Sequence, residues 1–170
     1  MGAFKHIFLV GMPGSGKSTV GRLLAEELGL DFYDLDNEII AIQGKSIAEI
    51  FSDEGEEGFR MLESEAMIKL IAQKNSFVMA AGGGTPCFLD GMKIMNESGV
   101  TVYLETPIEV LINRTKRKEH RPLLGENHVE KMRELLNTRE ICYSQAHYAL
   151  QTADLGLKQK VDGIIKLLAE

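Results

Sequence analysis

Short apolar runs alternate with longer amphipathic stretches along this chain. The runs at 7–10, 77–81 and 100–104 are unbroken, which is typical of strands covered on both faces of a parallel sheet. Between and after these runs the pattern predicts weaker strands at 31–33 and 148–150, and helices over 17–28, 59–71, 129–144 and 161–168. Two further helix starts are expected from local signals, a capping box at 46–49 and a cap followed by proline at 106–109. The alternation of the two kinds of element predicts a single three-layer α/β domain over residues 1–170, with a five-stranded parallel sheet flanked by helices.

Composition excludes several classes of protein. Of 170 residues, 44% are hydrophobic and 26% charged, as in ordinary globular domains that bury one core. The net charge of −6 argues against a nucleic-acid partner, which would require a basic surface. The apolar runs are too short to cross a membrane, and the two cysteines form no Cys-x-x-Cys pair. We therefore expect a cytoplasmic protein that binds neither nucleic acid nor membrane.

Residues 11–19, GMPGSGKST, match the phosphate-loop pattern G-x-x-x-x-G-K-[ST] between a predicted strand and a predicted helix. The glycines let backbone N–H groups approach phosphate oxygens, and the helix directs its positive dipole end to the same place. Lys17 adds a positive charge, and the Ser18 hydroxyl is a potential Mg²⁺ ligand. The loop predicts a nucleoside triphosphate site made by Gly14, Ser15, Gly16, Lys17, Ser18 and Thr19.

The acidic groups of such a site are expected from Asp34 and Asp36. The run at 77–81 ends in glycines rather than in an acid, and the chain lacks the Asn-Lys-x-Asp and Asp-x-x-Gly sequences of GTPases. Spaced i, i+2 in an extended chain, the two carboxylates would face the same side at the carboxyl end of a strand. One would orient Mg²⁺, and the other would meet a substrate hydroxyl.

A second basic feature lies at 114–121, where five of eight residues are Lys or Arg. The segment carries no apolar stripe and ends at Pro122, which indicates a mobile excursion that closes over the site. An arginine there would stabilise the charge of a phosphoryl group in transfer.

These features together resemble the shikimate kinase family. The resemblance depends on five stretches in order: 11–19, Asp34-Leu35-Asp36, 51–56 leading to Phe59-Arg60, the triple glycine at 82–84, and Arg121-Pro122-Leu123-Leu124 with Arg139 downstream. It implies a P-loop kinase fold with a lid at about 114–126 and a substrate-binding helical segment at about 34–63. It also implies a monomer that transfers phosphate from ATP, with Mg²⁺, to the 3-hydroxyl of shikimate.

The resemblance also implies roles for individual residues. Shikimate is a small acid with three hydroxyls, and its carboxylate suits the fork of an arginine. The implied shikimate-binding residues are Asp36, Arg60, Gly82, Gly83, Gly84 and Arg139; the implied metal ligands are Ser18 and Asp34; the implied catalytic residues are Lys17, Asp36 and Arg121; and Arg114 and Arg121 join the ATP site, with Arg114 stacked on adenine.

Some alternatives stay open. Arg60 could form only a helix-surface pair with Glu63, and Arg139 could be a solvated helix residue. The stretch 152–157 lacks the arginine and proline of a loop that flanks adenine in many family members, so the expected adenine contacts are Arg114 and backbone. The rival functions are a kinase of another small acceptor, such as gluconate or a nucleoside monophosphate, and a catalytically silent ATP-binding module.

Overall fold

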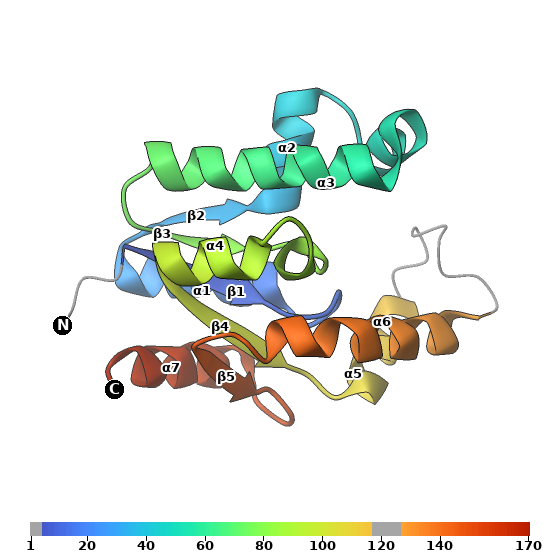
Figure 1. Ribbon diagram of the computed structural model, residues 1–170. Coiled ribbons are helices and arrows are strands. Elements are labelled where there is room, and N and C mark those ends of the chain that lie inside the picture. Colours follow the sequence, from blue (N-terminus) through green and yellow to red (C-terminus); the bar gives the residue numbers. More distant parts are fainter. Residues whose placement is uncertain (1–4, 117–126) are drawn as a thin grey trace.

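The structure is a computed structural model that describes residues 5–116 and 127–170. Within these ranges five strands form one sheet, shown in Figure 1. Every neighbouring pair is parallel, which confirms the predicted five-stranded parallel sheet. In spatial order the strands are β2 (Asp31–Asp34), β3 (Phe77–Ala80), β1 (His6–Val10), β4 (Val100–Glu105) and β5 (Tyr148–Gln151).

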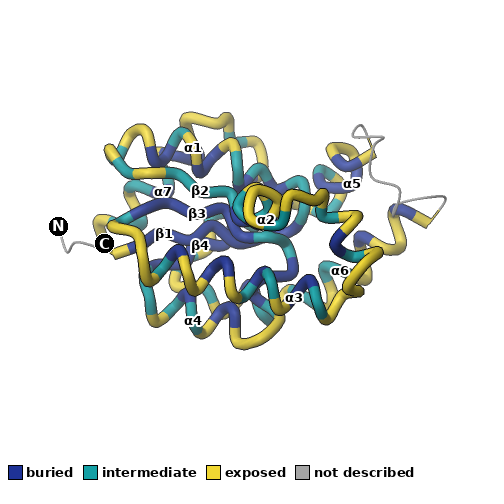
Figure 2. Tube along the Cα trace, turned by 90° about the horizontal axis from the view of Figure 1, so that it is seen from above, coloured by how far each residue is buried: buried dark blue, intermediate teal, exposed yellow. Residues whose placement is uncertain are grey.

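Helices cover both faces of this sheet. Figure 2 shows α1 (Lys17–Leu28) and α7 (Leu157–Leu168) on one side, and α3 (Ile47–Gln73) and α4 (Gly91–Ser98) on the other. The remaining helices described are α2, η1, α5 and α6, with bounds Leu35–Gln43, Thr85–Cys87, Ile108–Lys116 and His128–Tyr143. Three layers therefore result, as the alternation of elements predicts.

The central strand β1 shows why its sequence is apolar without interruption. Successive side chains of a strand point to opposite faces of the sheet. Phe8 and Val10 join the core that packs against α3 and α4, whereas Ile7 and Leu9 join the core that packs against α1 and α7. A strand buried on both faces needs apolar residues at every position.

Helix α3 is longer than the periodicity predicts. It begins at Ile47, after a capping box in which Ser46 and Glu49 bond to each other's backbone, as the Ser-x-x-Glu sequence indicates. Gly55, with φ 71°, interrupts the helical geometry, and this left-handed conformation favours glycine. The sequence pattern finds only the second part, which carries the regular apolar stripe.

Two helices, α2 and α4, are absent from the sequence-based prediction. Helix α2 follows β2 without a loop, because Asp34 is both the last residue of the strand and the N-cap of the helix. Helix α4 is short and follows a residue, Asp90, whose side chain makes no capping bond. Helix α7 also begins four residues earlier than expected, at Leu157. None of the helices described is long and apolar enough to span a bilayer.

Candidate active site

The loop between β1 and α1 is shaped to receive phosphate groups. Gly14 and Gly16 have φ values of 85° and 87°, a region that favours glycine. A Cβ on Gly14 would lie 3.1 Å from the Thr115 side chain, so the loop also leaves no room for a larger residue there. Because α1 begins at Lys17, its positive dipole end faces the loop. The strand–loop–helix context that the motif requires is confirmed.

Lys17 is held over this loop by backbone carbonyls. Its Nζ donates to the carbonyl oxygens of Gly11 at 2.8 Å and Met12 at 3.0 Å, and the residue is only 9% exposed. Phosphate oxygens carry more charge than carbonyls and accept stronger hydrogen bonds from an ammonium group. Lys17 is therefore placed to bind the phosphates of a nucleotide in this loop.

The Ser18 hydroxyl donates a hydrogen bond to the Asp34 carboxylate, so a hydroxyl and a carboxylate oxygen lie together beside the loop. Asp34 also accepts from the backbone N–H of Asn37 at 3.2 Å, which fixes its orientation. Among the residues described, no three His, Cys, Asp or Glu side chains form a metal cluster. Mg²⁺ commonly takes only one or two carboxylates, with phosphates and water completing its shell. The donor set thus fits Mg²⁺ carried by a triphosphate.

A pocket of about 540 Å³ extends from the phosphate loop to the ends of β2 and β3. It brings together many of the residues that the sequence singles out. Its walls are Pro13, Gly14, Gly16, Lys17, Ser18, Thr19, Val20, Asp34, Asp36, Ala81, Gly82, Gly83, Arg114, Leu157 and Lys160. Ser15, in contrast, is fully buried and does not line the pocket, and its backbone N–H donates to the carbonyl oxygen of Met12 at 3.1 Å.

The local backbone structure that places Asp34 and Asp36 at the pocket differs from the one expected. The expectation of an extended chain through both residues is wrong, because Asp36 lies in the first turn of α2. Both carboxylates nevertheless line the pocket. The helix N-terminus favours their negative charge, since the helix dipole is positive there. The direct junction of strand and helix at Asp34, rather than the alternation of side chains along a strand, therefore brings both carboxylates to the pocket.

The triple glycine is the point where the acidic and basic groups of the site meet. A Cβ on Gly82 would lie 3.3 Å from Asp36 Oδ1 and 2.8 Å from Glu63 Oε2. On Gly83 it would lie 2.9 Å from Arg139 Nη1, and on Gly84 2.6 Å from the guanidinium nitrogens of Arg60. Any side chain at these positions would displace a charged group. The missing side chains allow two carboxylates and two guanidinium groups to approach the same short loop.

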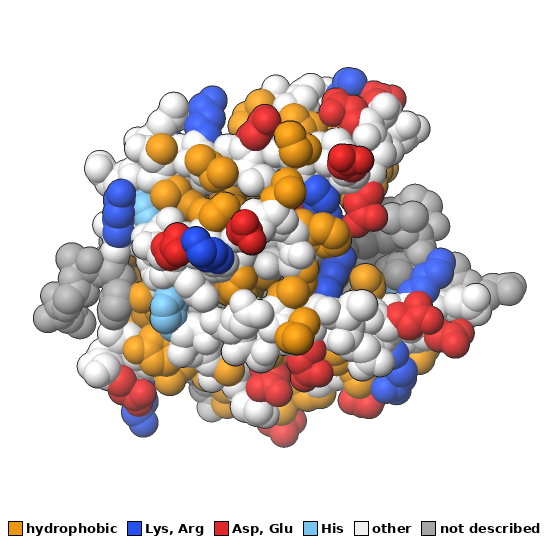
Figure 3. Space-filling model, viewed as in Figure 1, with side chains coloured by type: hydrophobic (Ala, Val, Ile, Leu, Met, Phe, Trp, Pro, Cys, Tyr) orange, Lys and Arg blue, Asp and Glu red, His pale blue; other side chains and the backbone are white. Residues whose placement is uncertain are grey.

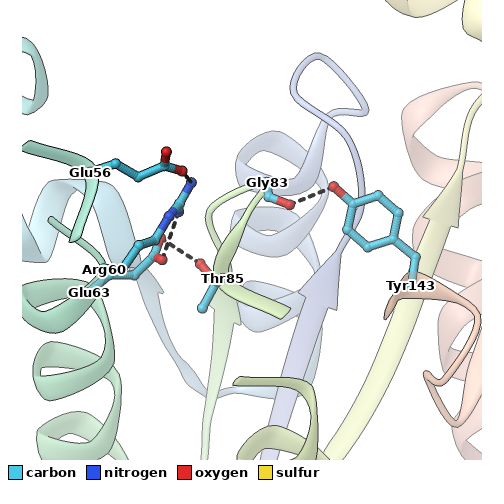
Figure 4. A network of polar contacts seen from close by, with 6 residues as sticks. All are labelled: Glu56, Arg60, Glu63, Gly83, Thr85 and Tyr143. Carbon is cyan, nitrogen blue, oxygen red and sulfur yellow. Dashed lines mark hydrogen bonds and ion pairs between the residues drawn. The ribbon is translucent and has the colours of Figure 1, made fainter. Parts of the chain in front are cut away.

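Arg60 is fixed by the network drawn in Figure 4. Its Nη1 donates to Glu63 Oε1 at 2.9 Å, and its Nη2 lies 3.5 Å from Glu56 Oε1. Glu63 in turn accepts from the Thr85 hydroxyl at 2.8 Å. The pair with Glu63 that the spacing indicates is present, but it is buried rather than at the helix surface. The guanidinium also lies over the Phe88 ring, 4.2 Å from its centroid, so this arginine is held rigidly.

Figure 3 shows basic side chains recessed in a hollow between the part of the surface formed by α3 and the part formed by α6. Helix α6 carries Arg139, which is half-buried. On the nucleotide side of the site, Arg114 lies in the last turn of α5 and donates to the carbonyl of Gly14 at 3.1 Å. Arg114 is thus part of a helix, so the expected excursion does not begin at residue 114, and residues 114–116 belong to α5.

Most of the expected lid at 114–126 lies outside the described residues, including Arg121 and the Pro122-Leu123-Leu124 stretch.

Sequence reasoning missed two pocket residues, Leu157 and Lys160, at the start of α7. Lys160 is only 6% exposed, and its burial, together with the charge of Arg114, lowers the pKa of its ammonium group. A lysine directly before the predicted helix 161–168, four residues from the apolar Ile164, was the available signal. The pocket wall near Arg114 therefore contains the Leu157 and Lys160 side chains as well as backbone.

Comparison with known proteins gives a consistent result. The model of a family described as shikimate kinase matches residues 13–169. A shikimate kinase from Persephonella marina is 41% identical, over 95% of this chain and 97% of the relative. The crystal structure of the Acinetobacter baumannii shikimate kinase in complex with shikimate has a TM-score of 0.91 and 40% identity, covering 98% of this chain and 94% of the other. The shikimate kinase structure from Bacteroides thetaiotaomicron has a TM-score of 0.92 at 34% identity, covering 99% of this chain and all of the other.

Proposed function

The chain belongs to the shikimate kinase family, whose reaction is the ATP-dependent phosphorylation of shikimate, and we propose that the pocket described above carries out this reaction on the 3-hydroxyl group. The observation that carries the proposal is the arrangement at the triple glycine, where Asp36 borders Gly82 while Arg139 and Arg60 border Gly83 and Gly84. A site of this kind suits a small acid with hydroxyl groups. A cytoplasmic monomer is the form that we expect for the enzyme.

Binding of shikimate would use both guanidinium groups. An arginine fork forms two parallel hydrogen bonds with a carboxylate, and two forks around one carboxylate fix its orientation. Arg60 keeps its buried partner Glu63 throughout, and this pairing holds the guanidinium against Gly84. The ring hydroxyls would then face Gly82 and Asp36, on the pocket side of the loop.

Phosphoryl transfer would depend on positioning and on charge stabilisation rather than on covalent chemistry. The amides of the phosphate loop and the start of α1 would hold the triphosphate, and Lys17 would stabilise negative charge on the group in transfer. Asp36 would orient the attacking hydroxyl and accept its proton. Arg121, outside the described residues, is the proposed lid arginine.

Ser18 and Asp34 would hold Mg²⁺ beside the phosphates. The bound ion would neutralise charge on the β- and γ-phosphate oxygens. The hydrogen bond from the backbone N–H of Asn37 would keep the Asp34 carboxylate directed toward Ser18. The proposal thus assigns distinct tasks to the two acids, Asp34 for the metal and Asp36 for the acceptor.

A coupled assay of ADP release tests the function. Purified protein with MgATP is offered shikimate, gluconate, or a nucleoside monophosphate, and the product is identified by ³¹P NMR. We expect ADP release only with shikimate, with phosphate on the 3-hydroxyl. ADP release stimulated by gluconate or a nucleoside monophosphate would favour a kinase of that acceptor. ATP binding without turnover on any acceptor would favour a catalytically silent ATP-binding module.

Arg139→Lys tests the carboxylate clamp. Lysine keeps the charge but loses the two-pronged geometry, so the KM for shikimate should rise about tenfold while the KM for ATP stays within twofold. Arg133→Lys is the matched control, because Arg133 lies on the same helix but is exposed and 3.8 Å from Glu109. Equal shikimate KM values for the two variants would contradict the clamp.

Lys160→Met tests the nucleotide end of the pocket. An anion beside Lys160 favours its charged form, so bound ATP should raise its lowered pKa, and ATP should bind less well as pH rises through that pKa. We expect the variant to raise the KM for ATP about tenfold at neutral pH and to flatten this alkaline loss. Lys158→Met, on the exposed face of α7, should do neither. An unchanged pH profile of ATP binding in Lys160→Met would exclude a contact with nucleotide.

A further inference from the structure

Tyr143 joins the helix that carries Arg139 to the triple glycine. The two residues are four apart on α6, so they lie on the same face of the helix. The Tyr143 hydroxyl donates to the carbonyl oxygen of Gly83 at 2.5 Å, as Figure 4 shows. Arg139 lies beside the same hydroxyl, and it also borders Gly83. One buried hydroxyl therefore contacts both a guanidinium of the proposed clamp and the loop that this guanidinium borders.

The tyrosine is well suited to remain a donor in this position. Its side chain is fully buried and packs on the Tyr103 ring, with 5.1 Å between the ring centroids. Burial raises the pKa of the Tyr143 hydroxyl well above its ordinary value, so the group stays protonated. Gly83 is half-buried, and without the tyrosine its carbonyl oxygen would lose the side-chain donor that the structure gives it. The bond to Gly83 is thus the means by which this carbonyl is satisfied.

The direction of the Gly83 carbonyl sets the direction of the next amide. In a trans peptide the C=O of one residue and the N–H of the next point in opposite directions, and no peptide bond of the described residues is cis. In Figure 4 Tyr143 lies on one side of Gly83 and Arg60 on the other. With its carbonyl turned to Tyr143, the peptide therefore presents the Gly84 N–H toward the side of Arg60. On that side it would be a donor beside the Arg60 guanidinium, which packs against Gly84.

We propose that Tyr143 is a positioning residue for the acid substrate, whose hydroxyl holds the Gly83–Gly84 peptide in the orientation that directs an N–H, rather than a carbonyl oxygen, toward the substrate carboxylate. Glycine on both sides makes the opposite orientation of this peptide accessible. A flipped peptide would place the Gly83 oxygen on the side of Arg60, where it would compete with the carboxylate for the guanidinium. This inference rests on the proposed function, since it concerns the same acid.

The test uses Tyr143→Phe, which removes only the hydroxyl, with Tyr103→Phe as the matched control. Tyr103 is a buried neighbour in contact with the Tyr143 ring, but it belongs to β4. We expect Tyr143→Phe to raise the KM for shikimate about tenfold, with kcat within threefold and the KM for ATP within twofold. Tyr103→Phe should leave all three within twofold. Shikimate-dependent shifts in melting temperature report folding and binding of each variant together.

Shikimate methyl ester separates positioning of the carboxylate from a general effect on the site. The ester lacks the charge, so Tyr143→Phe should change its KM by less than threefold. An equal rise for acid and ester, or an unchanged KM for shikimate, would overturn the inference. Loss of the folded state in Tyr143→Phe alone would also overturn it, because the hydroxyl would then serve stability. Failure of the wild-type protein to phosphorylate shikimate would instead refute the proposed function.

Discussion

Lys17→Met should lower kcat by roughly 10²–10³. Lys17 places a positive charge at the phosphate loop, where its ammonium group donates to the carbonyl oxygens of Gly11 and Met12. Bound phosphate oxygens would lie beside the same ammonium group. Methionine keeps most of the length of the side chain and removes the charge. The loss should fall on turnover more than on the KM for ATP, because negative charge at the transferring group develops most fully in the transition state.

Single-turnover kinetics with saturating ATP and shikimate would measure this loss directly. Lys93→Met provides the control, since Lys93 is an exposed lysine of α4 that pairs with Glu97 at 2.8 Å, and its removal should leave kcat within twofold. A Lys17→Met enzyme with at least a third of the wild-type kcat would show that the amides of the loop suffice for catalysis.

Asp36→Asn should lower kcat by about 10²–10⁴, the range that a positioned general base contributes. Asparagine has the same shape and can still orient a hydroxyl, but it cannot accept a proton. The KM for ATP should stay within twofold, because the phosphate loop and the Ser18–Asp34 pair are unchanged. Steady-state kinetics over pH 6–9 would give both parameters.

Glu38→Gln is the control for the charge of α2. Glu38 lies in the first turn of the same helix, so its loss changes the charge near the helix N-terminus as much as the loss of Asp36 does. It does not line the pocket. If Glu38→Gln lowered kcat as far as Asp36→Asn, the effect would come from the helix and not from a proton acceptor. A near-normal kcat in Asp36→Asn would remove Asp36 from the proposed chemistry.

Features encoded within a few consecutive residues could be predicted from the sequence. The phosphate loop, the capping box at Ser46 and the buried strand β1 each depend on local residue types and their spacing. Alternation of such segments was enough to predict the parallel sheet, since few topologies connect them without crossing. The triple glycine and the groups that approach it, Asp36, Arg60 and Arg139, could be brought together only through the family resemblance, because no local pattern connects them.

Features that depend on packing between distant segments could not be predicted. Helix α2 begins inside a stretch that reads as extended, because the Asp34 side chain caps it. Burial of the Arg60–Glu63 pair results from contact with Thr85 and Phe88, far along the chain. Lys160 and Tyr143 reach the site from elements that carry no motif of their own. Spacing along the sequence identifies the first partner of a side chain but not its surroundings.

The two acidic neighbours of Arg60 differ in how easily they can be replaced. Glu63 is enclosed and bonded twice, whereas Glu56 is 60% exposed and its 3.5 Å contact is long. A bound anion could therefore replace Glu56 as a partner of Arg60, because Glu56 is already largely solvated. Glu63 would keep its ion pair with Arg60. The guanidinium is then never without a counter-charge, whether the site is empty or occupied. Under the proposed function, uncharged analogues of the acid would gain nothing from such an exchange, and the site would discriminate against them when they bind.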